Sequence, residues 1–139
     1  MTYKKRNTNN RKCYYYKRIK LNEKEAGIFD DIVDAIFIIL LENSPRKENV
    51  IKQLRQYNLH SNIIIQYNKG FKNCSKDLIK QQSNFDLLDA NYQIFETSQK
   101  MGYKNILVLE DDFIVTPNIN KRDYITSIKK IVKDDNYNL

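Results

Sequence analysis

Three short apolar runs interrupt a largely polar chain and predict three buried strands. They cover residues 35–41 (AIFIILL), 62–67 (NIIIQY) and 105–109 (NILVL). Continuous runs of β-branched and aromatic residues are typical of strands that are covered on both faces, as in parallel sheets. We therefore expect the three strands to lie side by side and parallel.

Helical periodicity precedes the first run and also fills the interval between the first two runs. Residues 22–33 are expected to form a short helix, and Ser44-Pro45 supplies an N-cap and first-turn pair for a second one. Each has an apolar face, which comprises Ile28, Phe29 and Ile32 in the first helix, and Val50, Ile51, Leu54 and Tyr57 in the second.

A long helix is predicted between the second and third runs. It follows a polar connection over residues 68–82, starts at a capping box formed by Ser83 and Asp86, and ends before Gly102 at the C-cap. Its expected apolar face comprises Leu87, Leu88, Tyr92, Ile94, Phe95 and Met101.

A last helix follows the third run, with Asn120 and Asp123 as its cap and Tyr124, Ile125, Ile128, Ile131 and Val132 as its apolar positions. Strands and helices thus alternate at the spacing of an α/β layered domain with a mostly parallel sheet and flanking helices.

The positive charge of this chain is concentrated at its N-terminus. The 139 residues carry a net charge of +7, but the first 20 hold eight Lys and Arg and no acid, so the remainder is almost neutral. We expect residues 1–21 to be a basic, disordered tail and residues 22–139 to be the folded domain. Tyrosines between the basic residues leave open a second interpretation, an arm that binds nucleic acid.

The two cysteines, Cys13 and Cys74, lie far apart and form no CxxC pair. We therefore expect neither a disulfide nor a zinc site, and an intracellular, cytoplasmic protein with reduced thiols. The longest apolar run has seven residues, whereas a membrane-spanning helix needs about 20.

The strongest chemical signal is the acidic triplet Glu110-Asp111-Asp112, directly after the third strand. Ligands of parallel sheets collect at the carboxyl ends of strands, and Mn²⁺ or Mg²⁺ takes oxygen ligands from carboxylates and substrate phosphates. Such a cation would stabilise a leaving diphosphate. A solvated turn is the other interpretation, and phosphatases, receiver domains and nucleases have similar clusters.

The sequence excludes several other kinds of site. The three glycines are isolated, so no P-loop or dinucleotide-binding loop is present. His60 is the only histidine, and we expect it at the surface, which leaves no components for a nucleophilic triad.

Arg46, close behind the first strand, is a candidate partner for a diphosphate or carboxylate.

This order of elements resembles glycosyltransferase family 25, which includes lipopolysaccharide-modifying and procollagen galactosyltransferase-like enzymes. The resemblance covers residues 28–139 and is carried by FDLLDANYQIF (residues 85–95) followed by ILVLEDDF (residues 106–113). It implies the GT-A fold, a Rossmann-like sheet with flanking helices, and sugar transfer from a nucleotide-sugar donor. The LEDDF form and a composition rich in residues with A/T-rich codons look like a branch found in large DNA viruses and unicellular eukaryotes, and a viral origin would place the protein in the host cytoplasm.

Residue by residue, the resemblance places the family's DxD-like motif at the acidic triplet. Glu110 and Asp112 would then contact Mn²⁺, and Asp111, Asn43 and Arg46 would face the nucleotide sugar. The catalytic base and the glycan or protein acceptor are not identified.

Two features differ from the family pattern. The better-known branch has a Ser-His pair in the helix before the acidic strand, where this chain has Ala90-Asn91-Tyr92. A full GT-A domain has further strands after the acidic motif, so we expect an incomplete, truncated form. The alternative function is a non-catalytic remnant or a polyanion-binding module that uses the basic tail, and a metal-dependent phosphoryl-transfer enzyme is a third.

Overall fold

The computed structural model describes residues 10–20, 26–119 and 122–134. The elements in these ranges are η1 (Arg11–Cys13), β1 (Tyr14–Ile19), β2 (Ala35–Leu41), α2 (Lys47–Gln56), β3 (Ile63–Asn68), α3 (Ser83–Lys100), β4 (Ile106–Glu110) and α4 (Arg122–Lys133). The α/β class predicted from the sequence is confirmed.

The four strands form one mixed sheet in the order β1-β3-β2-β4. β2 pairs in parallel with β3 on one side and with β4 on the other, so the prediction of three parallel neighbours is confirmed. This arrangement brings the carboxyl ends of β2, β3 and β4 to the same edge of the sheet, where ligands of open α/β sheets bind.

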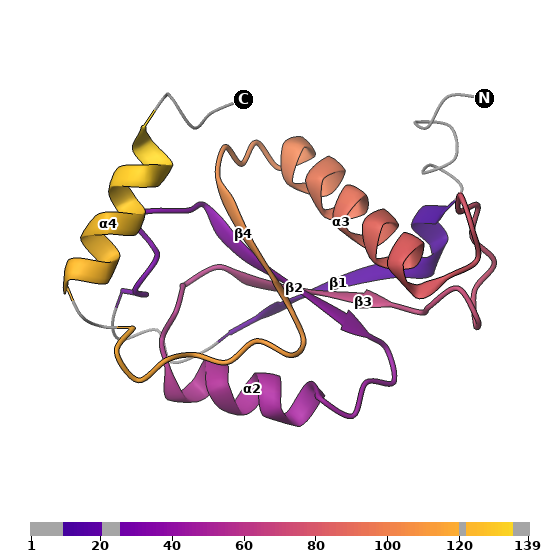
Figure 1. Ribbon diagram of the computed structural model, residues 1–139, viewed down its shortest axis with the longest axis horizontal. Helices are drawn as coiled ribbons and strands as arrows, with labels where there is room; N and C mark the ends of the chain where they lie inside the picture. The colour runs from indigo at the N-terminus through magenta and orange to yellow at the C-terminus, as the bar shows by residue number, and fades with distance from the viewer. Residues whose placement is uncertain (1–9, 21–25, 120–121, 135–139) are drawn as a thin grey trace.

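A hydrophobic core lies on each face of the sheet because successive side chains of a strand point in opposite directions. Ile36, Ile38 and Leu40 of β2 pack with α2, whereas Phe37 and Ile39 pack with α3. Figure 1 shows these two helices on opposite sides of the sheet. Half-buried residues of α4 join the core on the α2 side.

The basic N-terminal segment differs most from expectation. Residues 14–19 form the edge strand β1, which is antiparallel to β3 along its whole length. The prediction of a disordered tail is therefore wrong for residues 10–19, while residues 1–9 lie outside the described part. Hydrogen bonds to β3 satisfy the backbone groups of β1 that face it, and Tyr14 is buried while Lys17 and Arg18 remain exposed.

The helix expected over residues 22–33 is absent from its described part. Residues 26–33 form turns, in which the carbonyl of Phe29 accepts the N–H groups of Ile32 and Val33. The apolar positions are nevertheless buried, because Phe29, Ile32 and Val33 belong to the core on the α2 side.

His60 was expected at the surface and is buried instead, with 5% of its area exposed. Its Nε2 lies 2.7 Å from the carbonyl oxygen of Val33, and its Nδ1 accepts the N–H of Asn62 at 2.8 Å. Both ring nitrogens are thus used to join the turns to the start of β3.

The helix ends follow the predicted signals in part. α2 starts later than expected, with Arg46 as N-cap, and the Ser44 hydroxyl accepts the N–H of Arg46 at 3.1 Å. The side chain of Asp86 forms no capping box, because it is used elsewhere. Gly102 follows α3 with φ of 78°, which favours glycine, as predicted for its C-cap region.

A disulfide joins Cys13 to Cys74 across 61 residues of sequence. It connects η1, directly before β1, to the loop between β3 and α3. The expectation that no disulfide forms is wrong, and with it the premise on which an intracellular, reduced protein was inferred. Within the described residues, no helix meets the length and hydropathy needed to cross a membrane.

Breaking this disulfide should destabilise the fold. Closing a loop of this length restricts the unfolded chain, and a disulfide of this kind typically contributes about 2–4 kcal/mol. We expect the free energy of unfolding in urea to fall by that amount in the Cys13→Ser/Cys74→Ser variant. Dithiothreitol should have the same effect on the wild type and none on the variant. Equal midpoints for wild type and variant under oxidising conditions would contradict the disulfide.

Candidate functional site

An open cleft of about 660 Å³ lies at the carboxyl ends of β2, β3 and β4. Three segments line it, namely residues 41–46 after β2, residues 68–73 after β3, and Glu110 with Asp111 at the end of β4. The N-terminal part of α3 closes one side through Asp86 and Leu87. The cleft therefore occupies the edge that the parallel topology favours for a ligand.

Two residues of the connection after β2 bind the side chain of Asp111. The Arg46 guanidinium lies 3.2 Å from Oδ1 of Asp111, and the Ser44 hydroxyl donates to Oδ2 at 2.8 Å. The Asp111 side chain is 18% exposed, whereas that of Arg46 is 58% exposed. A carboxylate held in the wall and a more exposed guanidinium thus lie together at the mouth of the cleft.

Of the five residues that the sequence singled out, the structure brings four to this cleft. Asn43, Arg46, Glu110 and Asp111 all line it. Asp112 is exposed in the turn after β4 and is not among the lining residues. The acidic triplet is therefore divided between the cleft and the surface beyond it.

The connection after β3 forms the opposite wall and adds positive charge. Lys69 and Lys72 are exposed lining residues on either side of a tight turn at Gly70. Gly70 has φ of 80°, which favours glycine, and its carbonyl accepts the N–H groups of Asn73 and Cys74. With Arg46, three cationic side chains surround the cleft.

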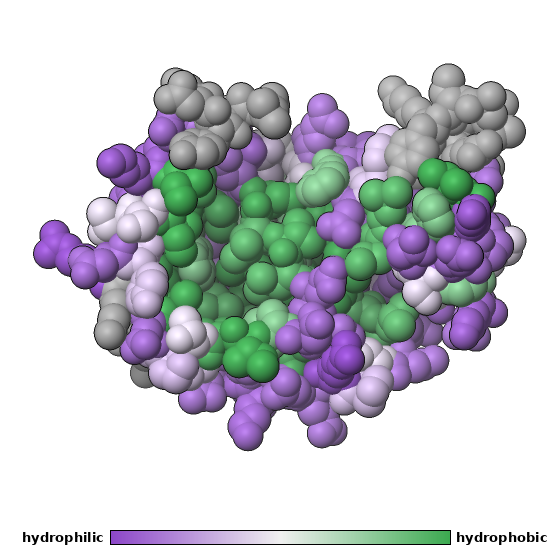
Figure 2. Space-filling model, in the orientation of Figure 1, coloured by the Kyte–Doolittle hydropathy of each residue, from purple (hydrophilic) through white to green (hydrophobic). Residues whose placement is uncertain are grey.

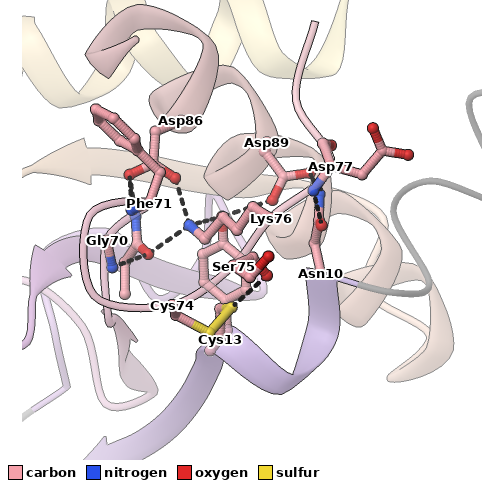
Figure 3. The surroundings of a disulfide bond; sticks show 12 residues. Asn10, Cys13, Gly70, Phe71, Cys74, Ser75, Lys76, Asp77, Asp86 and Asp89 are labelled. Carbon is pink, nitrogen blue, oxygen red and sulfur yellow. Dashed lines mark hydrogen bonds and ion pairs between the residues drawn. A yellow bond between two sulfur atoms is a disulfide. The ribbon is translucent and has the colours of Figure 1, made fainter. Parts of the chain in front are cut away.

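A buried ion pair between Lys76 and Asp86 supports this wall (Figure 3). The Lys76 side chain is 0% exposed and that of Asp86 is 7% exposed. The ammonium also donates to Oδ1 of Asn68 at 2.6 Å and to the hydroxyl of Tyr14 at 2.7 Å. Burial lowers the pKa of Lys76, and the adjacent carboxylate of Asp86 opposes that shift.

The network extends from Lys76 to the N-terminal segment. The Tyr14 hydroxyl donates to Asp89 at 2.6 Å, and the Asn10 amide donates to the other oxygen of Asp89 at 3.0 Å. Asn10 also pairs with the backbone of Asp77 in both directions. Burial, reinforced by the hydrogen bond to Asp89, raises the pKa of Tyr14, so this hydroxyl stays protonated as a donor.

The buried face of α3 is consequently more polar than predicted. It comprises Asp86, Asp89, Ala90, Gln93, Ile94 and Ser98. Leu88, Phe95 and Met101, which were expected in the core, are 46–53% exposed. The helix turns its polar side inward because the buried partners of its two aspartates lie beneath it.

Glu110 and Asp111 are the residues of the acidic triplet that could hold a hard divalent cation in the cleft. Glu110 and Asp111 supply carboxylate oxygens, and Mg²⁺-like ions are commonly held by one or two carboxylates plus substrate oxygens and water. Among the described residues, no three potential Asp, Glu, His or Cys ligands cluster closely enough to hold a metal alone. Oxygen atoms of a ligand would have to complete the coordination.

Sequence reasoning missed the whole wall after β3. Asn68-Lys69-Gly70 follows an apolar strand in the same way that the acidic triplet follows β4, so the rule that ligands bind at strand ends also applies to it. Lys76 had no local signal, because its partners Tyr14 and Asp86 are 62 and 10 residues away.

Comparisons with known proteins do not extend this description. No family model, curated protein or solved structure matches the chain.

Removing the charge of Lys76 should destabilise the protein. In the Lys76→Met variant Asp86 would remain buried without its cation, and loss of one partner of a buried pair costs about 3–5 kcal/mol. Lys72→Met, an exposed change in the same loop, should alter the free energy of unfolding by less than about 0.5 kcal/mol. Urea denaturation of both variants measures the difference, and equal effects would contradict a structural role of the pair.

Proposed function

We propose that the cleft binds the diphosphate of a nucleotide sugar together with Mn²⁺ or Mg²⁺, and that the protein is a metal-dependent glycosyltransferase of the GT-A type. The observation that supports this most is the meeting of Arg46 and Asp111 at the carboxyl edge of three parallel strands. Asn43 and Glu110 line the same cleft, as the resemblance to glycosyltransferase family 25 implies for a donor site.

The charges of the cleft suit a diphosphate bound with a cation. Glu110 and Asp111 would hold the cation, which neutralises phosphate charge and stabilises the diphosphate as a leaving group. Arg46 offers a planar set of donors to phosphate oxygens, and Lys69 and Lys72 add two exposed positive charges on the opposite wall. The lining also holds four carboxylates, those of Glu42, Asp86, Glu110 and Asp111, so a diphosphate would bind here together with a cation rather than alone.

The proposal assigns donor binding to the described residues. Sugar transfer also needs an acceptor held against the donor, and positioning of reactants contributes roughly 7–11 kcal/mol to such reactions.

Mn²⁺ and a nucleoside diphosphate added together should raise the melting temperature by several degrees, since a ligand that binds only the native state stabilises it. In Asp111→Asn this shift should disappear, because the cation loses a charged ligand. Asp31→Asn, which changes an exposed turn residue before the amino end of β2 and outside the cleft lining, is the matched control and should keep the full shift.

The Asp112→Asn variant tests which carboxylate of the acidic triplet binds the cation, Asp111, which lines the cleft, or Asp112, which the sequence motif favours. Because Asp112 does not line the cleft, this variant should respond like the wild type. Loss of the shift in Asp112→Asn alone would move the cation to the residue that the sequence motif favours. An unchanged shift in Asp111→Asn would contradict the site.

A polyanion-binding module is the second candidate function, and one observation favours it. Lys12, Lys17, Arg18 and Lys20 are exposed in and around the edge strand β1. Lys17 also lies 5.8 Å from the ring centre of Tyr15, which stacks on Tyr67. A basic strand edge with a neighbouring aromatic ring suits a single-stranded nucleic acid.

Binding to a single-stranded oligonucleotide, measured by fluorescence anisotropy at several salt concentrations, tests this candidate. If β1 binds the phosphates, Lys17→Gln/Arg18→Gln should weaken binding and reduce its salt dependence, because fewer counterions are released. The pair Lys129→Gln/Lys130→Gln in α4 removes equal charge elsewhere and should have the smaller effect. Equal effects of the two pairs would contradict a specific role of β1.

A further inference from the structure

The outer edge of β4 has no strand beside it among the described residues. β4 is the last strand in the order β1-β3-β2-β4 and pairs only with β2. In contrast to β2 and β3, none of its residues is fully buried. An unpaired edge of this kind presents free backbone groups to which another strand can hydrogen-bond.

The surroundings of this edge are apolar. Figure 1 shows β4 in front of the other strands, and in the same orientation Figure 2 shows a broad hydrophobic area in the middle, bordered by hydrophilic residues. Ile106 and Val108 border the core on the α3 side, and Leu107 and Leu109 border the core on the α2 side. Such an area with a polar border is typical of a protein interface.

The backbone of Val108 faces the free edge. The N–H of Ile36 in β2 donates to the carbonyl of Asn62, directly before β3, so the backbone groups of Ile36 point toward β3. Successive residues of a strand point their backbone groups to opposite sides, and those of Phe37 therefore point toward β4. Phe37 lies opposite Val108 in the parallel register. In a parallel pair, when the backbone groups of one residue point toward the partner strand, those of the residue opposite it point away. The backbone groups of Val108, and of Ile106 two residues before it, therefore point to the free edge and can bind a new strand.

The charges at the two ends of β4 are opposite. Lys104 precedes the strand and Glu110 ends it, and both are exposed. The carboxylate of Asp34 accepts the N–H groups of Lys104 and Asn105 at 2.6 and 3.1 Å, which fixes the backbone at this end. A strand with a positive start and a negative end is complementary to a second copy of itself in the antiparallel direction.

We propose that β4 pairs antiparallel with β4 of a second copy, so that two sheets join into one across a twofold axis at Leu107. This register places Lys104 of each copy opposite Glu110 of the other. It also places Ile106 opposite Val108, the two residues whose backbones face the edge. The hydrophobic areas of the two copies then cover each other. The dimer shares only Glu110 with the proposed donor site, and its tests measure association in the absence of metal and nucleotide, so either proposal can fail alone.

Sedimentation velocity over a range of concentrations tests the dimer. The wild type should show a reversible monomer–dimer equilibrium at up to about 100 µM. Val108→Pro removes an outward N–H and should be monomeric with an unchanged circular dichroism spectrum. A monomeric wild type, or association into large species without a defined dimer, would overturn the proposal.

Charge exchange tests the register. In Lys104→Glu, the new glutamate of each copy would lie opposite Glu110 of the other, and this repulsion should weaken dimerisation by about tenfold. The double variant Lys104→Glu/Glu110→Lys places opposite charges together again and should restore the dimer. Lys52→Glu, an exposed change in α2, makes the same change in net charge and should leave the dimer unaffected. Failure of the double variant to dimerise better than Lys104→Glu, or an equal loss in Lys52→Glu, would overturn the assigned pairing.

Discussion

The buried ammonium of Lys76 is the contact on which the architecture around the cleft depends. It is bound by Asp86 of α3, Asn68 of β3 and Tyr14 of β1, so one side chain joins a loop to a helix and two strands. Taking a charge out of water is costly unless its partners are in place, which makes this arrangement intolerant of partial packing. The Cys13–Cys74 disulfide fastens the same loop to η1 from a separate point.

This buried support explains how a wall made of a loop can form part of a site. Asn68 and Asp86, which bind Lys76, also line the cleft, so the ion pair positions the base of the wall directly. Above it, the turn at Gly70 carries Lys69 and Lys72 outward. The other wall is fixed through Asp111, which joins the end of β4 to the connection after β2. The Lys76–Asp86 ion pair and the contacts of Asp111 with the connection after β2 thus hold the segments that line the cleft at the ends of the three parallel strands.

The parallel part of the fold was predictable from the sequence, because an uninterrupted apolar run such as β2 is typical of a strand that is covered on both faces. β1 was missed because Tyr14–Ile19 mixes aromatic and basic residues, and only pairing with β3 identifies it as a strand. The buried face of α3 was misjudged for a related reason. Leu88 and Phe95 are more hydrophobic than Asp86, but burial of Asp86 depends on Lys76, and no local pattern shows that contact. The cleft residues after β2 and β4 were predictable from their position at strand ends.

The proposed function requires that this supported edge bind a cation through Asp111 and Glu110 and a diphosphate through Arg46. A crystal structure with Mn²⁺ and a nucleoside diphosphate, with the metal located by its anomalous scattering, tests it most directly. The account predicts a manganese peak at coordination distance from Asp111 or Glu110, with phosphate oxygens completing the coordination and contacting Arg46. Manganese bound elsewhere, or a nucleotide outside the cleft, would contradict it.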